Sequence, residues 1–110
     1  MALTGFSPKV RELALERSGG ICECCAAAPV QQLHHRRARG AGGSKRVDTN
    51  EVSNLFAICE PCHRHIESHR AEALVNGWLV RQGKNPAGTE ILYRKTDWAF
   101  LTPDGSIIFL

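Results

Sequence analysis

Two pairs of cysteines at C-x-x-C spacing limit the folds that are open to this chain. Cys22 and Cys25 form the first pair, and Cys59 and Cys62 form the second. Together they supply four thiolates, which is the complement of a closed tetrahedral zinc site. A chain of 110 residues fits one small domain, and a metal bound only by the folded chain adds its binding free energy to folding. We therefore expect a structural Zn²⁺ at these cysteines.

The remaining cysteine and the compartment bear on this assignment. The chain has five cysteines, an odd number, and its start, MALTGFSPK, lacks the apolar core of a secretory signal. No apolar run approaches the ~20 residues that a membrane span needs. We expect a soluble, reducing compartment, where metal ligands are favoured over disulfides. Redox pairs or free thiols remain an alternative. Cys24 could replace Cys25 in a C-x-C pairing, but we assign it as a non-ligand because C-x-x-C is the commoner knuckle.

The pattern of apolar and turn residues predicts a single α+β domain over residues 1–110. Ser7 and Pro8 begin a predicted helix that Gly19 ends, with one apolar face formed by Val10, Leu13 and Ala14. Residues 21–76 are predicted to hold short strands around a basic loop, followed by a helix. That helix has Pro61 near its start and Asn76-Gly77 at its end, with core contacts expected from Ile66, Leu74 and Val75.

The last section, residues 77–110, changes character. It contains the short apolar runs GWLVR, ILYR and WAFL, and Pro103-Asp104-Gly105 is a strong turn signal before the run IIFL. We expect a β-rich C-terminal appendage that carries no catalytic group. Its aromatic residues are predicted to build core, with a partner surface as the alternative: Trp78, Trp98, Phe100 and Phe109.

A run of basic residues follows two adjacent histidines in QQLHHRR. From Arg36 to Arg46 the sequence RRARGAGGSKR carries five cations, no carboxylate and three glycines, within a chain whose formal charge is +3. Such a loop can bring a DNA phosphate to a nearby site in a salt-dependent way. The predicted DNA-binding residues are Arg36, Arg37, Arg39, Lys45 and Arg46. The alternative is a solvated, disordered loop.

The histidines lie between the cysteine pairs. If the cysteines share one metal, His63 is held next to that anchor at the start of a helix, with Glu67 one turn further on the same face. His34 or His35 would approach from the opposite side.

The stretch CECC…HHRRARGAGGSKRVDTNEVSNLFAICEPCHRHIESHR resembles the HNH endonucleases, the ββα-metal nucleases, in their zinc-stabilised form. The matching pieces are His34-His35, Asn54 and His63, in this order and bracketed by the cysteine pairs. The resemblance covers residues 8–76 and is greatest to the small HNH proteins of bacterial viruses. It implies a ββα-metal core with a structural four-cysteine zinc site, preceded by the N-terminal helix and followed by the β appendage.

The resemblance also implies roles for individual residues. His34 and His63 would bind a divalent catalytic cation, and His35 would be the general base that activates water. Asn54 would hydrogen-bond backbone across the hairpin loop and so hold His35 in place. The alternative for Asn54 is an ordinary turn residue before an apolar strand.

This chain departs from the family at Glu67, where many members carry a histidine. A carboxylate at this position can reach the same cation and favours harder metals such as Mg²⁺ or Mn²⁺, although Ni²⁺ and Zn²⁺ remain possible. The alternative is that Glu67 makes only a surface ion pair with Arg64 or Arg70. His65 and His69 match no motif position, and we expect them to be solvated or to face phosphate.

Together these observations predict a metal-dependent HNH endonuclease that nicks or cuts DNA with low sequence specificity. We expect the protein to act in the cytoplasm, the host cytoplasm if the chain is phage-encoded, with no membrane partner. The resemblance further suggests genome packaging beside terminase subunits, or a free-standing homing-type nuclease. Two hypotheses compete with it. One is a non-catalytic zinc-ribbon module that binds nucleic acid, and the other, a secreted disulfide protein, conflicts with the missing signal and the odd cysteine count.

Overall fold

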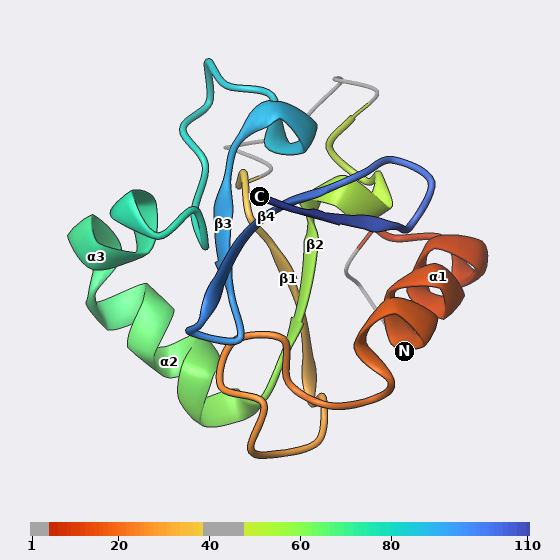
Figure 1. The fold of residues 1–110 in the computed structure, drawn as a ribbon, viewed down its shortest axis with the longest axis horizontal. Coiled ribbons are helices and arrows are strands. Elements are labelled where there is room, and N and C mark those ends of the chain that lie inside the picture. Colours follow the sequence, from red (N-terminus) through yellow and green to blue (C-terminus); the bar gives the residue numbers. More distant parts are fainter. Residues whose placement is uncertain (1–4, 39–47) are drawn as a thin grey trace.

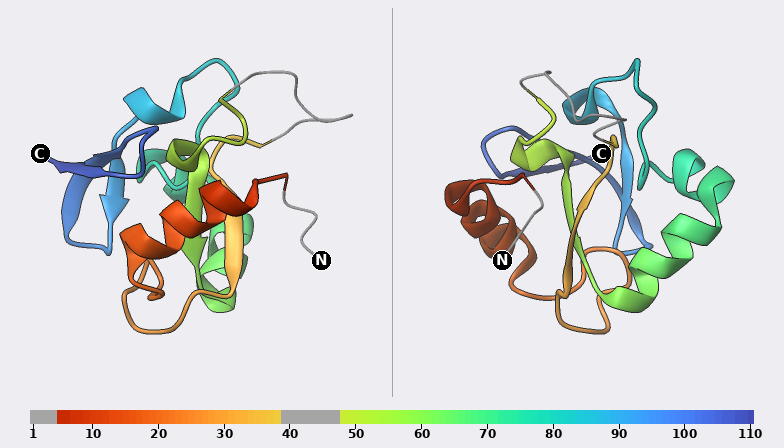
Figure 2. Two further views of the ribbon diagram at one scale, coloured as in Figure 1. Left: turned by 90° about the vertical axis from the view of Figure 1, so that its right-hand side faces the viewer. Right: turned by 180° about the vertical axis from the view of Figure 1, so that it is seen from behind.

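A two-stranded antiparallel hairpin lies between helices in the computed structural model, which places residues 5–38 and 48–110. Strand β1 (Gln32–His35) pairs with β2 (Leu55–Ile58), so that His34 lies opposite Phe56 and His35 opposite Leu55. Helix α1 (Pro8–Ser18) lies on one side of the hairpin, and helices α2 (Glu60–Ser68) and α3 (Arg70–Val75) lie on the other (Figures 1 and 2). The chain is therefore a mixed α and β fold, as predicted.

Alternation along β2 divides the apolar side chains into two clusters. Successive residues of a strand point to opposite faces, and all four residues of β2 are buried because both faces are covered. Leu55 and Ala57 pack with Ala14 and its neighbours on α1. Phe56 and Ile58 belong to a larger cluster that extends to α2, α3 and the C-terminal strands. The same alternation sends the two adjacent histidines of β1 to different faces.

Helix α1 begins and ends as the sequence predicts. The Ser7 hydroxyl oxygen accepts a hydrogen bond from the Val10 amide at 3.2 Å, and Pro8 occupies the first turn, where its missing N–H is tolerated. Gly19 adopts the left-handed conformation, with φ 66°, and ends the helix. Val10, Leu13 and Ala14 share one apolar face, as predicted, and this face packs against Leu55 and Ala57 of the hairpin.

The predicted helix after the second cysteine pair is divided into two. His69 leaves helical geometry, with φ −126° and ψ 61°, and the Ser68 hydroxyl donates to the Arg64 carbonyl at 2.9 Å. The predicted core contact of Ile66 is confirmed and that of Val75 is wrong, because the latter is 75% exposed. Gly77 ends the second helix at φ +74°, where a Cβ would lie 1.9 Å from the Glu90 carbonyl oxygen. Only glycine fits there.

The C-terminal section forms a three-stranded antiparallel sheet of β3 (Ile91–Tyr93), β4 (Asp97–Leu101) and β5 (Ile107–Phe109), in the order β3-β4-β5. Gly105 makes the β4–β5 turn at φ 93°, as the Pro103-Asp104-Gly105 signal predicts. Two 3-10 turns, η1 (Val52–Asn54) and η2 (Pro86–Gly88), precede β2 and β3. In Figure 1, β3 is seen beside the central hairpin, on the side of α2 and α3, and β4 runs obliquely to it.

The description of this section as an appendage needs correction. The residues it contributes to the cluster around Phe56 and Ile66 include Trp78, Leu79, Ile91, Tyr93, Ala99 and Leu101. The core therefore continues across residue 77 and is completed by the C-terminal sheet. Of the aromatic residues predicted as core, Trp78 is buried, whereas Trp98 and Phe109 are exposed. Among the described residues, no helix has the length and apolar character to cross a membrane.

Candidate metal centres

The four paired cysteines meet at one point. Their four sulfur atoms all lie within 4.8 Å of one another, and Cys25 Sγ is 3.8 Å from Cys59 Sγ. The residues are Cys22, Cys25, Cys59 and Cys62. Four sulfurs placed about 2.3 Å from one tetrahedral ion lie about 3.8 Å apart. These four side chains, named here the thiolate cluster, are therefore close enough to hold one metal ion such as Zn²⁺. The clustering of these cysteines is as predicted.

The backbone around the first cysteine pair suits thiolate ligands. The amides of Cys24 and Cys25 both donate to Cys22 Sγ at 3.4 Å, and the Ala27 amide donates to Cys25 Sγ at 3.4 Å. Burial opposes ionisation of Cys22, but backbone donors outweigh it and lower the pKa of this thiol to about 7. Hydrogen bonds aimed at sulfur stabilise the deprotonated form, which is the form that binds metal.

Cys24 does not belong to the thiolate cluster, in agreement with its assignment as a non-ligand. Its side chain is buried, and burial raises the pKa of the thiol to about 12. A buried neutral thiol behaves as a small apolar side chain.

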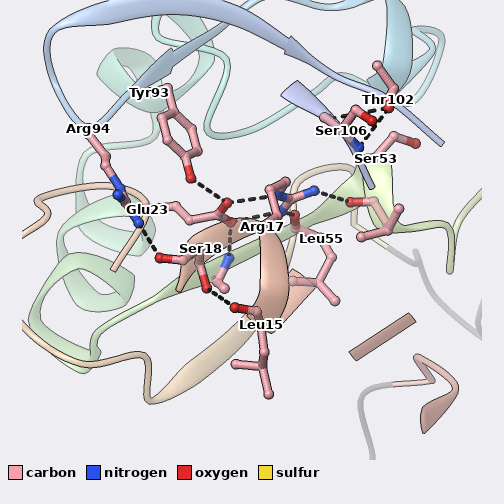
Figure 3. A network of polar contacts seen from close by, with 12 residues as sticks. Leu15, Arg17, Ser18, Glu23, Ser53, Leu55, Tyr93, Arg94, Thr102 and Ser106 are labelled. Carbon is pink, nitrogen blue, oxygen red and sulfur yellow. Dashed lines mark hydrogen bonds and ion pairs between the residues drawn. The ribbon is translucent and has the colours of Figure 1, made fainter. Parts of the chain in front are cut away.

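Glu23, within the first knuckle, carries a buried carboxylate that sequence reasoning did not single out. Arg17 donates to both of its oxygens at 2.7 Å, and the Tyr93 hydroxyl and the Ala57 amide donate at 2.8 and 2.9 Å (Figure 3). Both charged side chains are at most 1% exposed. The carboxylate thereby joins the knuckle to α1, β2 and β3. The sequence signal was a charged residue inside a cysteine knuckle, but its partners lie in distant segments.

A second group of potential ligands comes from β1 and α2. His34, His63 and Glu67, named here the histidine cluster, each place one ligand atom within 4.8 Å of the others. The two imidazole rings meet edge to face at 5.6 Å, and His63 Nε2 is 3.8 Å from a Glu67 oxygen one turn along α2. All three line a hollow of about 610 Å³. The structure thus brings together the three residues predicted to share a cation.

His34 is suited to be a neutral ligand. Its side chain is buried, and its Nε2 is 3.1 Å from the Trp78 carbonyl oxygen. A carbonyl accepts only, so this contact places the ring proton on Nε2 and leaves a lone pair on Nδ1. Burial, reinforced by the nearby His63, His35 and Arg36, lowers the pKa of His34 to about 4. The ring is therefore uncharged at neutral pH.

His35 lies on the opposite face of β1 but lines the same hollow. Its ring stacks on Phe6 with centroids 4.1 Å apart, and its Nε2 is 2.9 Å from Asn50 Oδ1. If the amide oxygen accepts this hydrogen bond, the ring proton is on Nε2. Neither Phe6 nor Asn50 was predicted, because each is a lone residue outside any motif.

Asn54 makes the backbone hydrogen bonds predicted for it. Its Oδ1 accepts from the Arg37 amide at 2.7 Å, and its Nδ2 donates to the carbonyls of Arg37 at 3.1 Å and Thr49 at 2.8 Å. The side chain is fully buried. It therefore fastens the chain just after the two histidines to the segment that leads into β2, and it is not an ordinary exposed turn residue.

Arg36 and Arg37 do not face solvent, so their assignment as DNA-binding residues is wrong. Arg36 is fully buried and donates to four backbone carbonyls, those of Ser53, Gly77, Pro86 and Thr89, at 2.9 to 3.0 Å. Burial lowers its pKa to about 9. Arg37 pairs with the Asp48 carboxylate and donates to the Lys84 carbonyl at 2.7 Å. Arg39, Lys45 and Arg46 lie outside the described residues.

Glu67 was expected either to join the histidines or to make a surface ion pair, and its two oxygens do both. One oxygen is near His63, and the other is 4.0 Å from Arg70 Nη1. Arg64 pairs with Glu60 instead.

His65 and His69 stack on each other, with ring centroids 4.1 Å apart, and His65 Nε2 is 2.9 Å from a Glu72 oxygen. As expected, both are exposed and outside the histidine cluster.

Comparisons with protein-family models, curated proteins and solved structures found no match to this chain. The likeness to HNH endonucleases therefore depends on the motif residues and on how they lie in the fold.

Proposed function

We propose that this chain is a metal-dependent endonuclease of the HNH type that hydrolyses DNA phosphodiester bonds with low sequence specificity. The observation that carries the proposal is the convergence of His34, His63 and Glu67 within 4.8 Å, at a hollow that His35 also lines. By the same resemblance, the cleavage would serve genome packaging beside a terminase or a homing-type reaction.

The thiolate cluster is proposed to hold a structural Zn²⁺. Its donor set is four sulfurs, and the amide donors around Cys22 favour the thiolate form. Four protein ligands complete a tetrahedral zinc shell, so no position is left for a substrate. The proposed role of this ion is to join the segment before β1 to the start of α2, which brings the three ligands of the histidine cluster together.

His35 is proposed to be the general base. With its Nε2 proton donated to Asn50 Oδ1, its Nδ1 can accept the proton of a water molecule that attacks phosphorus. The new bond joins the water oxygen to phosphorus, and the bond from phosphorus to the 3′ oxygen breaks. Phe6 and Asn50 would hold the imidazole in position, and Asn54 would hold the backbone that follows it.

The donor set of the histidine cluster fits a divalent cation. Two imidazoles and one carboxylate are ligands for Mn²⁺, Ni²⁺ or Zn²⁺, and the carboxylate also suits Mg²⁺. When bound, such an ion supplies a positive charge that stabilises the phosphate and the leaving oxygen. The neutral state of His34 supports its use as a ligand, since a protonated imidazole cannot bind metal.

The second candidate function is a non-catalytic zinc-ribbon module that binds nucleic acid. It accounts for the thiolate cluster but gives no reason for a neutral buried histidine, a second histidine and a carboxylate to converge beside His35. That convergence favours the nuclease.

Nicking of supercoiled plasmid tests the proposal. Purified protein is incubated with plasmid and Mg²⁺, Mn²⁺, Ni²⁺ or Zn²⁺, beside the variants His35→Ala and His65→Ala. We expect the wild type to nick with at least one ion and His35→Ala to lose a factor of about 10² to 10⁴ in rate, the usual contribution of a general base. His65 is an exposed histidine outside the cluster, so its variant should nick like the wild type.

Two results would contradict the nuclease. If His35→Ala nicks as fast as the wild type, His35 is not the base and a contaminant is the simplest source of activity. If neither protein nicks with any ion while both retain DNA, the binding module is the better description.

A further inference from the structure

The exposed cations at the hollow come from parts of the chain that sequence analysis did not connect with DNA. The hollow is lined by residues from β1, α2, α3 and the segment 79–82. Among the described residues, its arginines are Arg36, Arg70 and Arg81, and its one carboxylate is Glu67. The guanidinium of Arg36 is already bound by backbone carbonyls. Arg70 and Arg81 are therefore the described cations at this surface that can contact a ligand.

Arg81 is held at the edge of the hollow by its neighbours. The Val80 amide donates to the Arg36 carbonyl at 2.8 Å, and the Gln82 side-chain amide donates to the Ala38 carbonyl at 2.7 Å. These hydrogen bonds fasten the segment on both sides of Arg81 to the chain that continues β1. Arg81 is exposed and, within the part of the chain that the structure describes, no carboxylate pairs with it. Its charge at the hollow is thus not neutralised by a described side chain.

Arg70 lies next to the histidine cluster. Its side chain is 59% exposed, and its only ion pair among the described residues is the 4.0 Å approach to Glu67. An exposed pair at this distance contributes little. If Glu67 also binds a cation, its carboxylate attracts the Arg70 guanidinium even less. Because the pair contributes little even without a cation, Arg70 can turn to an anion at the hollow.

We propose that Arg70 and Arg81 form a phosphate-binding subsite that holds the DNA backbone beside the histidine cluster. This inference rests on the proposed function for the identity of its ligand, DNA. A guanidinium presents paired donors that match the oxygens of a phosphate, and contacts to phosphate position a duplex without reading its sequence. The subsite takes the role that the sequence suggested for Arg36 and Arg37.

The salt dependence of DNA binding tests this subsite without cleavage. Binding of a short fluorescent duplex is measured by anisotropy over a range of KCl concentrations, with His35→Ala protein and no added divalent cation. Each lost phosphate contact lowers the slope of log K against log [salt] by about 0.9. We expect Arg70→Gln with Arg81→Gln to lower the slope by about 1.8 and to weaken binding equally for unrelated duplex sequences.

Two variants serve as controls. Arg64, on the neighbouring helix, is 72% exposed and does not line the hollow, so Arg64→Gln should leave the slope unchanged. Arg70→Lys with Arg81→Lys keeps both charges and should keep most of the slope. Thermal unfolding of each variant, expected within a few degrees of the parent because the sites are exposed, excludes misfolding.

The inference is overturned if the double glutamine variant keeps the parental slope, or if Arg64→Gln lowers it as much. Plasmid nicking by the wild type separates this result from the proposed function. A lowered slope without any nicking leaves the phosphate subsite in place and removes the nuclease. Nicking with an unchanged slope leaves the nuclease and removes the subsite.

Discussion

The two candidate metal centres differ in how complete their ligand sets are. The thiolate cluster has four ligands from two knuckles, with Cys22 and Cys59 buried. The histidine cluster has three ligands from β1 and α2, and the Glu67 side chain is 53% exposed. A closed set of four protein ligands stabilises a fold, whereas three ligands leave a coordination position for water or substrate. The same small chain therefore offers one centre suited to stability and one suited to chemistry.

The surroundings of the two clusters differ in the same way. The knuckle of the thiolate cluster is joined to the core by the buried Glu23 carboxylate and Arg17. In the histidine cluster, His34 is held by the uncharged Trp78 carbonyl and Glu67 has only an exposed pair with Arg70, while the neighbouring His35 contacts the amide of Asn50. Substitutions of the buried ion pair in the first region should therefore change stability most, and substitution of the exposed Glu67 in the second should change activity with little loss of stability.

The largest expected effect is from Cys59→Ala. A structural zinc contributes on the order of 10 kcal/mol in small zinc peptides, comparable with the total stability of a domain of this size. We expect the variant to lose about one equivalent of bound zinc and its cooperative thermal unfolding transition, measured by metal analysis and circular dichroism.

Cys24→Ala is the matched control for this prediction, because Cys24 is as buried as Cys59 but lies outside the thiolate cluster. It should keep its zinc and fold. The ligand assignment is wrong if Cys24→Ala loses the metal and Cys59→Ala keeps it.

A smaller effect is expected from Arg17→Met, which removes the partner of Glu23. Breaking a buried ion pair on one side typically costs about 3–5 kcal/mol, because the other charge is left without compensation. Urea unfolding should show this loss of free energy of unfolding. Lys9→Met breaks an exposed pair with Glu12 on the same helix and should change the free energy by less than about 1 kcal/mol. Equal effects of the two variants would show that the Glu23 network does not support the knuckle.

The smallest effect on stability is expected from Glu67→Gln. An exposed substitution of this kind changes the free energy of unfolding by about 0.5 kcal/mol or less. Plasmid nicking with Mg²⁺ should nevertheless fall strongly, because a neutral amide is a weaker ligand for a hard cation than a carboxylate. Glu12→Gln, also exposed and distant from the hollow, should leave nicking unchanged. If Glu67→Gln also nicks normally, Glu67 serves only its ion pair with Arg70.

Sequence patterns correctly predicted the features that depend on residues close together in the chain. The C-x-x-C spacing identified the four cysteines that meet in the thiolate cluster, because a knuckle presents both of its sulfurs to one side. Ser7, Pro8 and Gly19 located α1 because capping depends on backbone groups a few residues away. In the same way, Pro103-Asp104-Gly105 located the last turn, and the spacing from His63 to Glu67 placed both on one helix face.

Whether each arginine is buried or exposed could be decided only by the tertiary structure. Arg36 and Arg37 stand in the same basic run as Arg39, and no local pattern distinguishes a buried cation from an exposed one. The carbonyls that bind Arg36 come from η1, the end of α3 and η2, which are distant in sequence. The same holds for Glu23 with Arg17 and Tyr93. The sequence by itself determined the ligand types, helix ends and turns, whereas long-range packing decided which charges are buried and which face the hollow, because burial depends on segments that only folding brings together.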